Sequence, residues 1–406
     1  MEKYVDYFAS AMQNIRMWIK RKYEKTIKDL VKQFPVVVLT GARQVGKTAL
    51  VQRVFPRFSY VSLDVPALSE QAEHSPHDFL ASYKEPLIID EVQYAPSLFR
   101  HLKGIVDKRK TPGRFVLTGS QNFSLMQGVL ESLAGRCAVL TMLNLSFREL
   151  KETLRNADPD AYFFKGGFPE LYEKPQIKPQ FWYAAYLATY LERDVRNISN
   201  VGNLRDFDRF LRATAIRTGQ ILSYSELARD VGIAPNTAKK WISVLQASGQ
   251  IVLIEPYHRN LGKRLIKSPK LYMCDTGLAA FLMGFEKLEE VMRHPVAGAL
   301  WETHVVMQVV RHYFSQGRQL PLWYWRTVHG AEVDLLIEKG GRFVAIEAKA
   351  TENPDEKALK GIQALQKFYG HQSLISGYVA SRTPYAYPIS GTVKAVPGSL
   401  IDQYIA

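Results

Sequence analysis

The segment from Gly41 to Thr48 holds the residues whose types and spacing are best suited to chemistry. It reads Gly-Ala-Arg-Gln-Val-Gly-Lys-Thr, which has the spacing of a phosphate-binding loop. Its glycines let the backbone curl, so that successive N–H groups and a helix N-terminus face the phosphates of ATP. We expect the Lys47 ammonium to reach the β- and γ-phosphates and the Thr48 hydroxyl to bind Mg²⁺. The predicted nucleotide contacts are Gly41, Ala42, Arg43, Gln44, Val45, Gly46, Lys47, Thr48 and Ala49.

The sequence on either side of this loop predicts the strand and the helix that such a loop requires. An apolar run from Pro35 to Thr40 indicates a buried strand, and residues 49–55 read as the start of a helix. From residue 34 onward, strands alternate with helices, a pattern typical of a parallel sheet. The alternative is a chance Gly-Lys-Thr at a strand-to-helix turn, and the flanking pattern argues against it.

A second candidate site element is the run Pro-Leu-Ile-Ile-Asp-Glu from Pro86 to Glu91. Apolar residues that lead into paired carboxylates match the second nucleotide motif of P-loop ATPases. We expect Asp90 to hold Mg²⁺ through water and Glu91 to polarise the attacking water. The alternative, surface charge at a strand end, is weakened by the phosphate-binding loop upstream.

Polar residues also follow the next predicted strand, residues 114–118. Ser120, Gln121 and Asn122 are candidates for sensing the γ-phosphate or orienting water, and the sequence does not decide among them. Of these three, we predict Ser120 to be the catalytic residue. The alternative is that all three are ordinary turn residues.

Several further motifs occur along the chain, and they are specific when taken together. They are Gly41–Thr48, Ile89–Gln93 (Ile-Asp-Glu-Val-Gln), Leu117–Ser120 (Leu-Thr-Gly-Ser), Ser132–Arg136 (Ser-Leu-Ala-Gly-Arg), Gly166–Glu170 (Gly-Gly-Phe-Pro-Glu) and Tyr190–Asp194 (Tyr-Leu-Glu-Arg-Asp). With them the chain resembles, over nearly its whole length, the AAA-type ATPases of bacteria and archaea that carry a C-terminal domain of unknown function. That family often has proline at the second loop position, where this chain has Ala42.

The resemblance implies that Arg136 is an arginine finger, supplied either in cis or by a neighbouring subunit. A guanidinium suits the charge that develops on the γ-phosphoryl group in the transition state. The alternative is a structural salt bridge.

Length, charge and cysteine content narrow the class of protein. A chain of 406 residues predicts two or three domains, and its net charge of +14 favours a polyanionic partner, nucleic acid before a membrane surface. Cys137 and Cys274 are too far apart in sequence to form a zinc knuckle or a disulfide framework. The sequence shows neither a signal peptide nor an apolar run long enough to cross a bilayer, so we expect a cytoplasmic protein.

Residues 223–257 carry a second strong signal, a helix-turn-helix pattern. Residues 225–230 predict a short helix, Gly232 a tight turn, and residues 235–248 a longer helix; a strand and a possible wing at residues 257–270 follow. Residues 201–270 hold twelve basic and five acidic residues, which gives +7, half of the +14 net charge. The alternative is a winged helix that serves as a protein-contacting lid.

In a DNA-binding helix-turn-helix, the start of the second helix faces base edges and the wing faces phosphates. The predicted base-facing residues are Asn236, Thr237, Lys239 and Lys240, and the predicted phosphate contacts are Arg259, Lys263, Arg264 and Lys267.

The last part of the chain carries a weaker third signal. Strand alternation places Glu347 and Lys349 on one face, and Asp334 lies on the preceding strand. This arrangement resembles the restriction-endonuclease-like superfamily, whose extra acid corresponds here to Glu302. The resemblance implies Mg²⁺ ligands at Asp334 and Glu347 and water activation by Lys349. The alternative is an intact fold whose charges are only solvated, or whose activity is lost.

We therefore predict an α/β multidomain protein with a P-loop NTPase parallel sheet, a winged helix-turn-helix and a restriction-endonuclease-like domain. The primary hypothesis is an ATPase that couples ATP turnover to DNA binding. The alternatives are a nucleotide-gated, metal-dependent nuclease and a nucleotide-dependent switch that acts on a protein partner or in a homo-oligomer. The predicted parts are a basic helix (1–33), the ATPase (34–150), a helical connector (151–219), the winged helix (220–285) and the nuclease-like domain (286–406).

Overall fold

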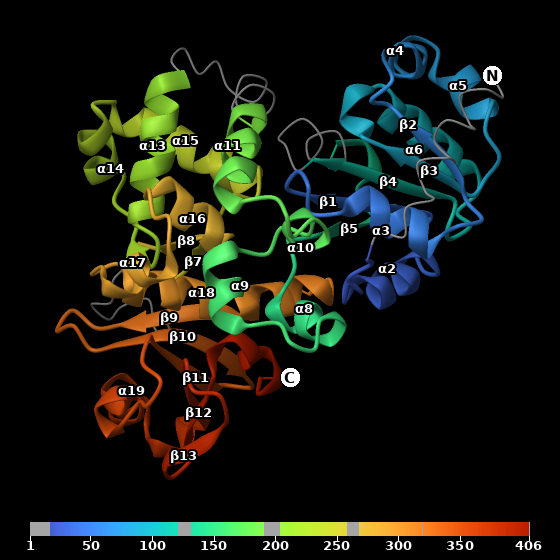
Figure 1. Cartoon of the computed structure of the whole chain (residues 1–406). Helices are drawn as coiled ribbons and strands as arrows, with labels where there is room; N and C mark the ends of the chain where they lie inside the picture. The colour runs from blue at the N-terminus through green and yellow to red at the C-terminus, as the bar shows by residue number, and fades with distance from the viewer. Residues whose placement is uncertain (1–16, 121–130, 191–203, 258–267, 319, 406) are drawn as a thin grey trace.

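The structure is a computed structural model, and it describes residues 17–120, 131–190, 204–257, 268–318 and 320–405. Figure 1 shows the first sheet (β1–β5) on one side, the helices around α14 and α15 on the other, and the C-terminal sheet (β9–β14) beneath. No helix in these ranges is both long and apolar enough to span a bilayer.

The N-terminal segment is less helical than the sequence predicted. Residues 18–21 are not helical, and α2 spans only Tyr23–Val31. Tertiary contacts fix the preceding residues instead, because the buried Arg21 side chain reaches backbone carbonyls and a carboxylate. The helix buries Tyr23, Ile27 and Val31 and packs on the first sheet. The predicted start of this helix, residues 1–16, lies outside the described residues.

A five-stranded parallel sheet, in the order β2-β3-β4-β1-β5, forms the predicted ATPase domain. Its central strands are buried on both faces, which explains their continuous apolar sequences. In β1, Val37 and Leu39 face one apolar cluster and Val36 and Val38 face the other. The strands and helices are β1 (Val36–Gly41), α3 (Lys47–Val54), β2 (Ser59–Ser62), α4 (Pro66–His74), α5 (Pro76–Ala81), β3 (Leu87–Asp90), η2 (Val92–Tyr94), α6 (Leu98–Lys108), β4 (Phe115–Ser120) and β5 (Cys137–Thr141).

The middle of the chain is mostly helical. The predicted boundary at residues 150 and 151 falls inside α8. Two helices, α14 and α15, meet at a turn where Gly232 has a φ of 81°, and a three-stranded antiparallel sheet adjoins them. The elements are α8 (Phe147–Thr153), α9 (Pro159–Lys165), α10 (Glu170–Glu173), α11 (Pro179–Tyr190), α13 (Leu204–Ile216), β6 (Gln220–Ile221), α14 (Tyr224–Val231), α15 (Pro235–Ala247), β7 (Ile251–Ile254), β8 (Lys270–Met273), α16 (Thr276–Leu282) and α17 (Leu288–Arg293).

The C-terminal part is a six-stranded mixed sheet in the order β13-β14-β12-β11-β10-β9. Strands β9, β10 and β11 form an antiparallel meander, and β12 and β14 continue parallel to β11. The elements are α18 (Ala297–Ser315), β9 (Leu322–Arg326), β10 (Glu332–Lys339), β11 (Arg342–Lys349), η4 (Glu356–Leu359), α19 (Lys360–Tyr369), η5 (His371–Ser373), β12 (Leu374–Ser381), β13 (Tyr387–Ser390), β14 (Val393–Pro397) and η6 (Gly398–Gln403).

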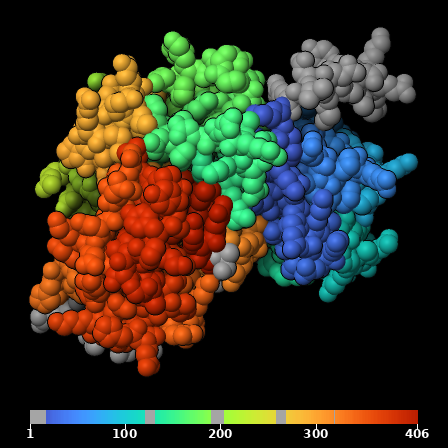
Figure 2. All heavy atoms as spheres, turned by 60° about the horizontal axis from the view of Figure 1, so that its bottom comes forward, coloured from blue at the N-terminus to red at the C-terminus, as the bar shows by residue number. Residues whose placement is uncertain are grey.

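One apolar cluster passes through all three parts, from Tyr23 through the middle helices to Ile405. The long helix α18 is buried along most of its length and contributes to this cluster. Figure 2 shows the C-terminal domain in front, with the green middle segment between it and the blue N-terminal part. The parts therefore share a core.

Candidate nucleotide site

The loop after β1 has the shape of an anion-binding turn. Gln44 and Gly46 adopt left-handed backbone conformations, with φ of 61° and 93°. Turns of this kind bend successive N–H groups around a concave surface that suits phosphate. Gln44 and Ala49 are exposed, whereas Ala42 and Val45 are buried, so the loop has one open and one packed face. The open face meets the N-terminus of α3, where phosphate binding is favoured.

The two side chains predicted to contact the nucleotide lie at the start of α3. The Lys47 ammonium is inside the loop and donates to the backbone carbonyls of Gly41 and Ala42, at 3.1 and 2.8 Å. The Thr48 hydroxyl donates to the Asp90 carboxylate, with distances of 3.0 and 3.1 Å to its two oxygens. The two nucleotide motifs predicted from separate stretches of sequence are therefore in direct contact.

Asp90 is a buried carboxylate surrounded by hydroxyl groups. Besides Thr48, it accepts hydrogen bonds from Thr118 and, at 2.9 Å, from the Tyr60 phenol. Burial, together with the neighbouring Asp90 charge, raises the pKa of Tyr60 above its ordinary value, so the phenol keeps the proton that it donates. These donors offset the cost of removing the carboxylate from water. They also hold its oxygens in place at the end of β3.

Glu91 follows Asp90 in a left-handed conformation with a φ of 55°, which directs its side chain away from the strand. Gln93 donates to the Glu91 carboxylate and also, at 3.3 Å, to the Ser120 hydroxyl at the end of β4. Ser120 is 3% exposed. The structure thus connects two of the predicted catalytic residues through a third side chain. The other candidates at this strand end, Gln121 and Asn122, lie outside the described residues.

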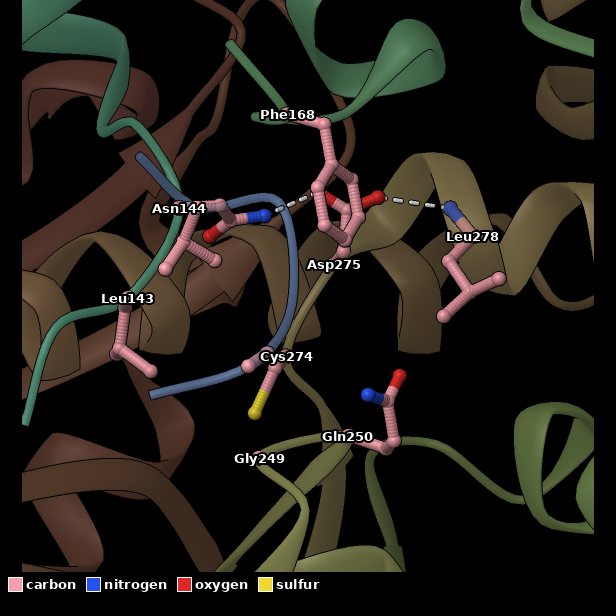
Figure 3. Close-up of a pocket in the computed structure, with 10 residues that line it drawn as sticks. Leu143, Asn144, Phe168, Gly249, Gln250, Cys274, Asp275 and Leu278 are labelled. Carbon is pink, nitrogen blue, oxygen red and sulfur yellow. Dashed lines mark hydrogen bonds between the residues drawn. The ribbon is translucent and has the colours of Figure 1, made fainter. Parts of the chain in front are cut away.

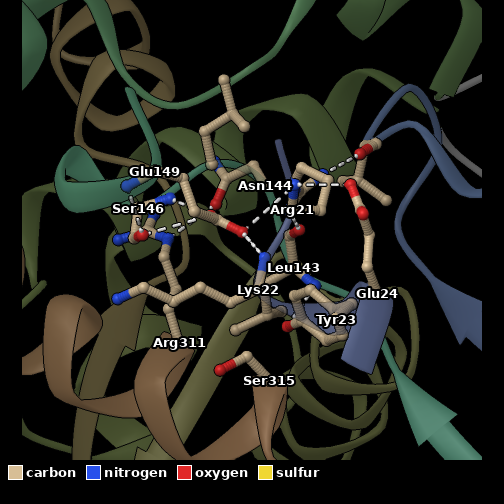
Figure 4. Close-up of polar contacts among 12 residues, drawn as sticks. Arg21, Lys22, Tyr23, Glu24, Leu143, Asn144, Ser146, Glu149, Arg311 and Ser315 are labelled. Carbon is tan, nitrogen blue, oxygen red and sulfur yellow. Dashed lines mark hydrogen bonds and ion pairs between the residues drawn. The ribbon is translucent and has the colours of Figure 1, made fainter. Parts of the chain in front are cut away.

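Arg21 supports the packed side of the loop (Figure 4). Its guanidinium donates to the Val45 carbonyl and to the Leu143 carbonyl, both at 2.7 Å, and its Nε pairs with Glu149 at 3.1 Å. The Arg21 and Glu149 side chains are only 2% and 3% exposed. Although burial raises the pKa of Glu149, Arg21 and the N–H groups of Ser146 and Lys22 outweigh it and hold this pKa below its ordinary value.

A second polar network lies on the same side of the loop (Figure 3). The Asp275 carboxylate caps α16 by accepting from the Leu278 N–H and also accepts from Asn144 and the Gly167 N–H, at 2.5–2.7 Å. Arg311 on α18 donates to Asn144 at 2.9 Å and to the Cys274 carbonyl at 2.7 Å.

Between this network and the loop is a cavity of about 10 Å³, lined by Ala42, Val45, Gln250 and Asp275 among others. That volume is about the minimum for one water molecule, so nucleotide must approach from the other, open face.

Arg136 directly precedes β5, the neighbour of β1, and lies at the end of the strands opposite to the loop. In the register of β5 with β1, Cys137 stands beside Val36 and Thr141 beside Thr40. The length of β1, roughly 17 Å at the usual rise per residue, therefore separates Arg136 from the loop of its own chain. Its guanidinium pairs with Asp107 at 2.6 and 3.0 Å. The role of Arg136, as an arginine finger or as a structural salt bridge, stays a prediction.

The predicted nuclease-like residues lie on β10, β11 and α18, and their role stays a prediction. The Asp334 carboxylate accepts from the Ala348 N–H at 2.8 Å, and Lys349 pairs with Glu347 at 3.0 Å on one face of β11. Burial and the nearby Asp334 charge raise the pKa of Glu347 well above its ordinary value. Asp334 and Glu347 are 9% and 4% exposed, so they are not simply solvated charges. Glu302 on α18 reaches the same cluster.

The predicted nucleic-acid residues on α15 lie on its outer face. Asn236, Lys239 and Lys240 are exposed and Thr237 is partly exposed, whereas Ala238, Trp241, Ile242, Val244 and Leu245 form the buried face. The predicted phosphate contacts Arg259, Lys263, Arg264 and Lys267 lie outside the described residues.

Sequence reasoning missed several residues that shape these sites. Tyr60 and Thr118 donate to Asp90, Gln93 contacts Glu91, and Arg21 contacts the loop backbone. Gln93 alone had a signal, because it belongs to the motif Ile-Asp-Glu-Val-Gln. The others are single polar residues, and only the fold brings them to the site.

Comparison with known proteins agrees with this geometry. Residues 33–151 match the family described as "AAA domain", which makes the first part an AAA-type P-loop ATPase domain. Residues 156–289 match "Domain of unknown function (DUF8612)", and residues 297–401 match "Domain of unknown function (DUF4143)".

Two curated relatives resemble the chain over most of its length. They are uncharacterized proteins of Mycobacterium tuberculosis and Mycobacterium bovis, each 31% identical over 371 residues, which is 90% of this chain and 81% of the relative. The chain therefore belongs to the same family as these proteins, an ATP-binding AAA-type ATPase family.

Solved structures that resemble the chain are more distant. A Walker-type ATPase of Pyrococcus abyssi is 15% identical, with a TM-score of 0.44, over 64% of this chain and 94% of that one. AMPPCP-bound DnaA from Aquifex aeolicus is 16% identical, with a TM-score of 0.25, over 55% of this chain and 85% of that one.

Proposed function

We propose that this protein hydrolyses ATP at the loop of Gly41–Thr48 and couples the turnover to nucleic-acid binding. In this proposal Lys47 neutralises the β- and γ-phosphates, and Glu91 orients and polarises the attacking water. Ser120 at the end of β4 contacts the γ-phosphate. Gln93 supports this assignment, because its hydrogen bonds to Glu91 and Ser120 place both side chains at one end of the sheet.

The residues around Asp90 fit a magnesium ion. The Thr48 hydroxyl and the Asp90 carboxylate are hard oxygen donors that already lie 3.0 Å apart at the N-terminus of α3. Thr48 would hold the ion directly, and Asp90 would hold it through water. When bound, Mg²⁺ supplies the positive charge that neutralises the phosphate oxygens.

We assign nucleic-acid binding to a winged helix formed by α13–α15 and the strands β6–β8. The observation that carries this assignment is the outer face of α15, where Lys239 and Lys240 are exposed at the start of the second helix of the turn. Neither ammonium forms an ion pair with a carboxylate among the described residues. The excess of +7 over residues 201–270 gives this module the electrostatic character that DNA phosphates attract.

The coupling between this module and the ATP site is supported by their shared cavity wall. Gln250, which follows α15, and Asp275, which follows β8, line the same cavity as Ala42 and Val45 of the loop. A shift of the loop on nucleotide binding would therefore move the residues at the base of the module, because close-packed side chains transmit displacement.

The test is the salt dependence of binding to a fluorescently labelled DNA duplex. Each lysine that contacts a phosphate contributes about 1 to the slope of log affinity against log salt concentration, so Lys239→Ala with Lys240→Ala should reduce the slope by about 2. The matched control is Lys103→Ala with Lys108→Ala on α6, which removes the same charge from an exposed helix of the ATPase domain. If the two double variants change the slope equally, the α15 surface is not the DNA site, and a protein partner becomes the better account.

A further inference from the structure

Three carboxylates of the C-terminal domain form an acidic cluster that surrounds a lysine ammonium. Ligand oxygens of Glu302 on α18 and of Glu332 and Asp334 on β10 all lie within 4.8 Å of one another, a spacing that could hold a metal ion. The Lys270 ammonium enters this cluster from β8, which belongs to the preceding module. It lies 2.7 Å from Glu302 and 3.9 Å from Asp334, and it also pairs with Glu332.

Lys270 is fixed in this position. The residue is 2% exposed, and the Tyr272 hydroxyl, two residues further along β8, donates to Glu302 at 2.6 Å. Burial lowers the pKa of Lys270, but the surrounding carboxylates outweigh it and raise this pKa above its ordinary value, so the side chain stays cationic. An uncompensated charge is costly in such an environment, and here the ammonium offsets part of the charge of the three carboxylates, while Arg326 pairs with Glu332 at 3.0 Å.

The ammonium and a divalent ion would compete for the same place. A magnesium or manganese ion needs oxygen ligands at about 2.0–2.2 Å, which requires the cluster to close around it. A positive charge held 2.7 Å from Glu302 opposes such an ion both sterically and by charge repulsion.

The contact between the two modules is reinforced near Lys270. The Tyr257 N–H donates to the Tyr324 carbonyl at 2.8 Å, and the Tyr324 N–H donates to the Glu255 carbonyl at 3.1 Å, so the segment after β7 pairs with β9. The Tyr324 hydroxyl also donates to the Ser268 carbonyl, two residues before Lys270, at 2.5 Å. The connection between β7 and β8 is thus tied to β9 on both sides of its described part, which holds β8 beside the acidic cluster.

We propose that Lys270 is the built-in cation of the cluster formed by Glu302, Glu332 and Asp334. It takes the place of a divalent metal ion and keeps that ion out while β8 is docked on the C-terminal domain. This inference goes beyond ATP turnover and DNA binding and stands independently of them. It implies that loss of the lysine charge creates a divalent-cation site at this cluster, which shares only Asp334 with the predicted ligand pair of Asp334 and Glu347.

The test is the binding of Mn²⁺ alone, without nucleotide, to the full chain by isothermal titration calorimetry. Lys270→Met removes the charge and keeps the length of the side chain, and we expect it to bind one Mn²⁺ at least about tenfold more tightly than wild type, because a repelling charge is gone. Adding Asp334→Asn to this variant should abolish the new binding. Lys270→Gln serves as a second variant, and each variant's melting curve shows whether it is folded.

Two outcomes would overturn the inference. One is a wild-type protein that binds Mn²⁺ at a site removed by Glu332→Gln, because Glu332 belongs to this cluster and not to the predicted pair of Asp334 and Glu347, and the cluster would then hold a metal in spite of the lysine. This comparison needs no Lys270 variant, so it tests the inference even if those variants do not fold. The other is a folded Lys270→Met protein whose Mn²⁺ affinity equals that of wild type. Neither outcome depends on ATP hydrolysis, so a failure of the proposed function is distinguishable from a failure here.

Discussion

Gln93 is the residue that joins the proposed water-activating carboxylate to the end of the next strand. It donates to Glu91 and to Ser120, and both contacts lie at the end of the sheet that carries the phosphate-binding loop. A side chain that orients a catalytic carboxylate contributes to the transition state more than to ATP binding.

We expect Gln93→Leu, which keeps the size of the side chain but cannot donate, to lower kcat for ATP about tenfold and to leave KM nearly unchanged. A misplaced catalytic group commonly costs a factor of this size or more. Steady-state hydrolysis assays measure both constants. Gln93→Asn tests whether a shorter amide restores part of the loss. A variant that raises KM with kcat unchanged would instead assign Gln93 to nucleotide binding.

For single residues, the sequence predicted the positions of those that belong to short local motifs. Lys47, Thr48 and Asp90 lie where the motif spacing placed them, because a strand, a loop and a helix N-terminus are fixed by neighbouring residues. Arg21 and Lys270 could not be predicted. Each acts on residues more than twenty positions away, Val45 for Arg21 and Glu302 for Lys270, and only the tertiary fold brings them together.

The segment before α2, the phosphate-binding loop and α8 are joined by a single buried ion pair. Arg21 contacts the Val45 carbonyl, and its partner Glu149 is the residue that completes the capping box of α8 with Ser146. Removing one member of a buried pair leaves an uncompensated charge, which is strongly destabilising.

We expect Glu149→Gln to lower the free energy of unfolding at pH 7 by about 3 kcal/mol. The matched control is Glu152→Gln, which removes an exposed carboxylate from the same helix, where its pair with Arg148 is worth about 0.5 kcal/mol. Urea denaturation at pH 7 measures both. A loss for Glu149→Gln no larger than the control's would show that the pair does not hold these elements together.

The same pair predicts a pH dependence. The pKa of Glu149 is lower in the folded protein than its ordinary value of about 4.3, so its contribution to stability is complete above that pH and is lost as the pH falls through the folded value. Wild type should therefore lose more stability than Glu149→Gln between pH 5 and pH 3, values chosen to bracket the ordinary pKa of about 4.3. Equal losses in the two proteins over this range would contradict the lowered pKa.

Element type was more predictable than element boundaries. Residues 225–230 and 235–248 were expected to be helices on their periodicity, and α14 and α15 lie there. The helix expected over residues 1–33 is described only as α2, Tyr23–Val31. The spacing of Trp18 and Ile19 suits the apolar face of a helix. The contacts of the Arg21 guanidinium with Glu149 and two backbone carbonyls instead fix this segment in a non-helical conformation.

At the scale of the whole molecule, the position of Arg136 gives a test for assembly. Arg136 lies at the end of the strands opposite to its own phosphate-binding loop. Its side chain is partly exposed, with 30% of it accessible. If it acts as an arginine finger, it serves the site of a neighbouring copy.

We expect Arg136→Ala and Lys47→Ala to be inactive separately and to regain part of the activity when mixed. The reason is that mixed assemblies contain sites with an intact loop from one chain and an intact arginine from the other. Asp107→Ala is the control, because it removes only the ion pair and should keep turnover. A mixture that stays inactive, or a loss in Asp107→Ala equal to that in Arg136→Ala, would make Arg136 a structural residue.

The shared core also explains why the contacts between the parts were not predictable. Local patterns indicate helices and strands along the chain, whereas the cavity wall between the loop and Asp275 and the entry of Lys270 into the acidic cluster depend on how the parts pack. No periodicity in the sequence encodes a contact between two separate modules.

The central claim is that ATP turnover responds to nucleic acid, and steady-state ATP hydrolysis with and without duplex DNA tests it most directly. Lys47→Ala is the blank, and it should lose at least about 100-fold in kcat, the usual cost of removing a group that stabilises transition-state charge. We predict that duplex DNA raises wild-type turnover and that Lys239→Ala with Lys240→Ala reduces this stimulation. Turnover that persists in Lys47→Ala, or wild-type turnover that does not change with DNA, would contradict the account.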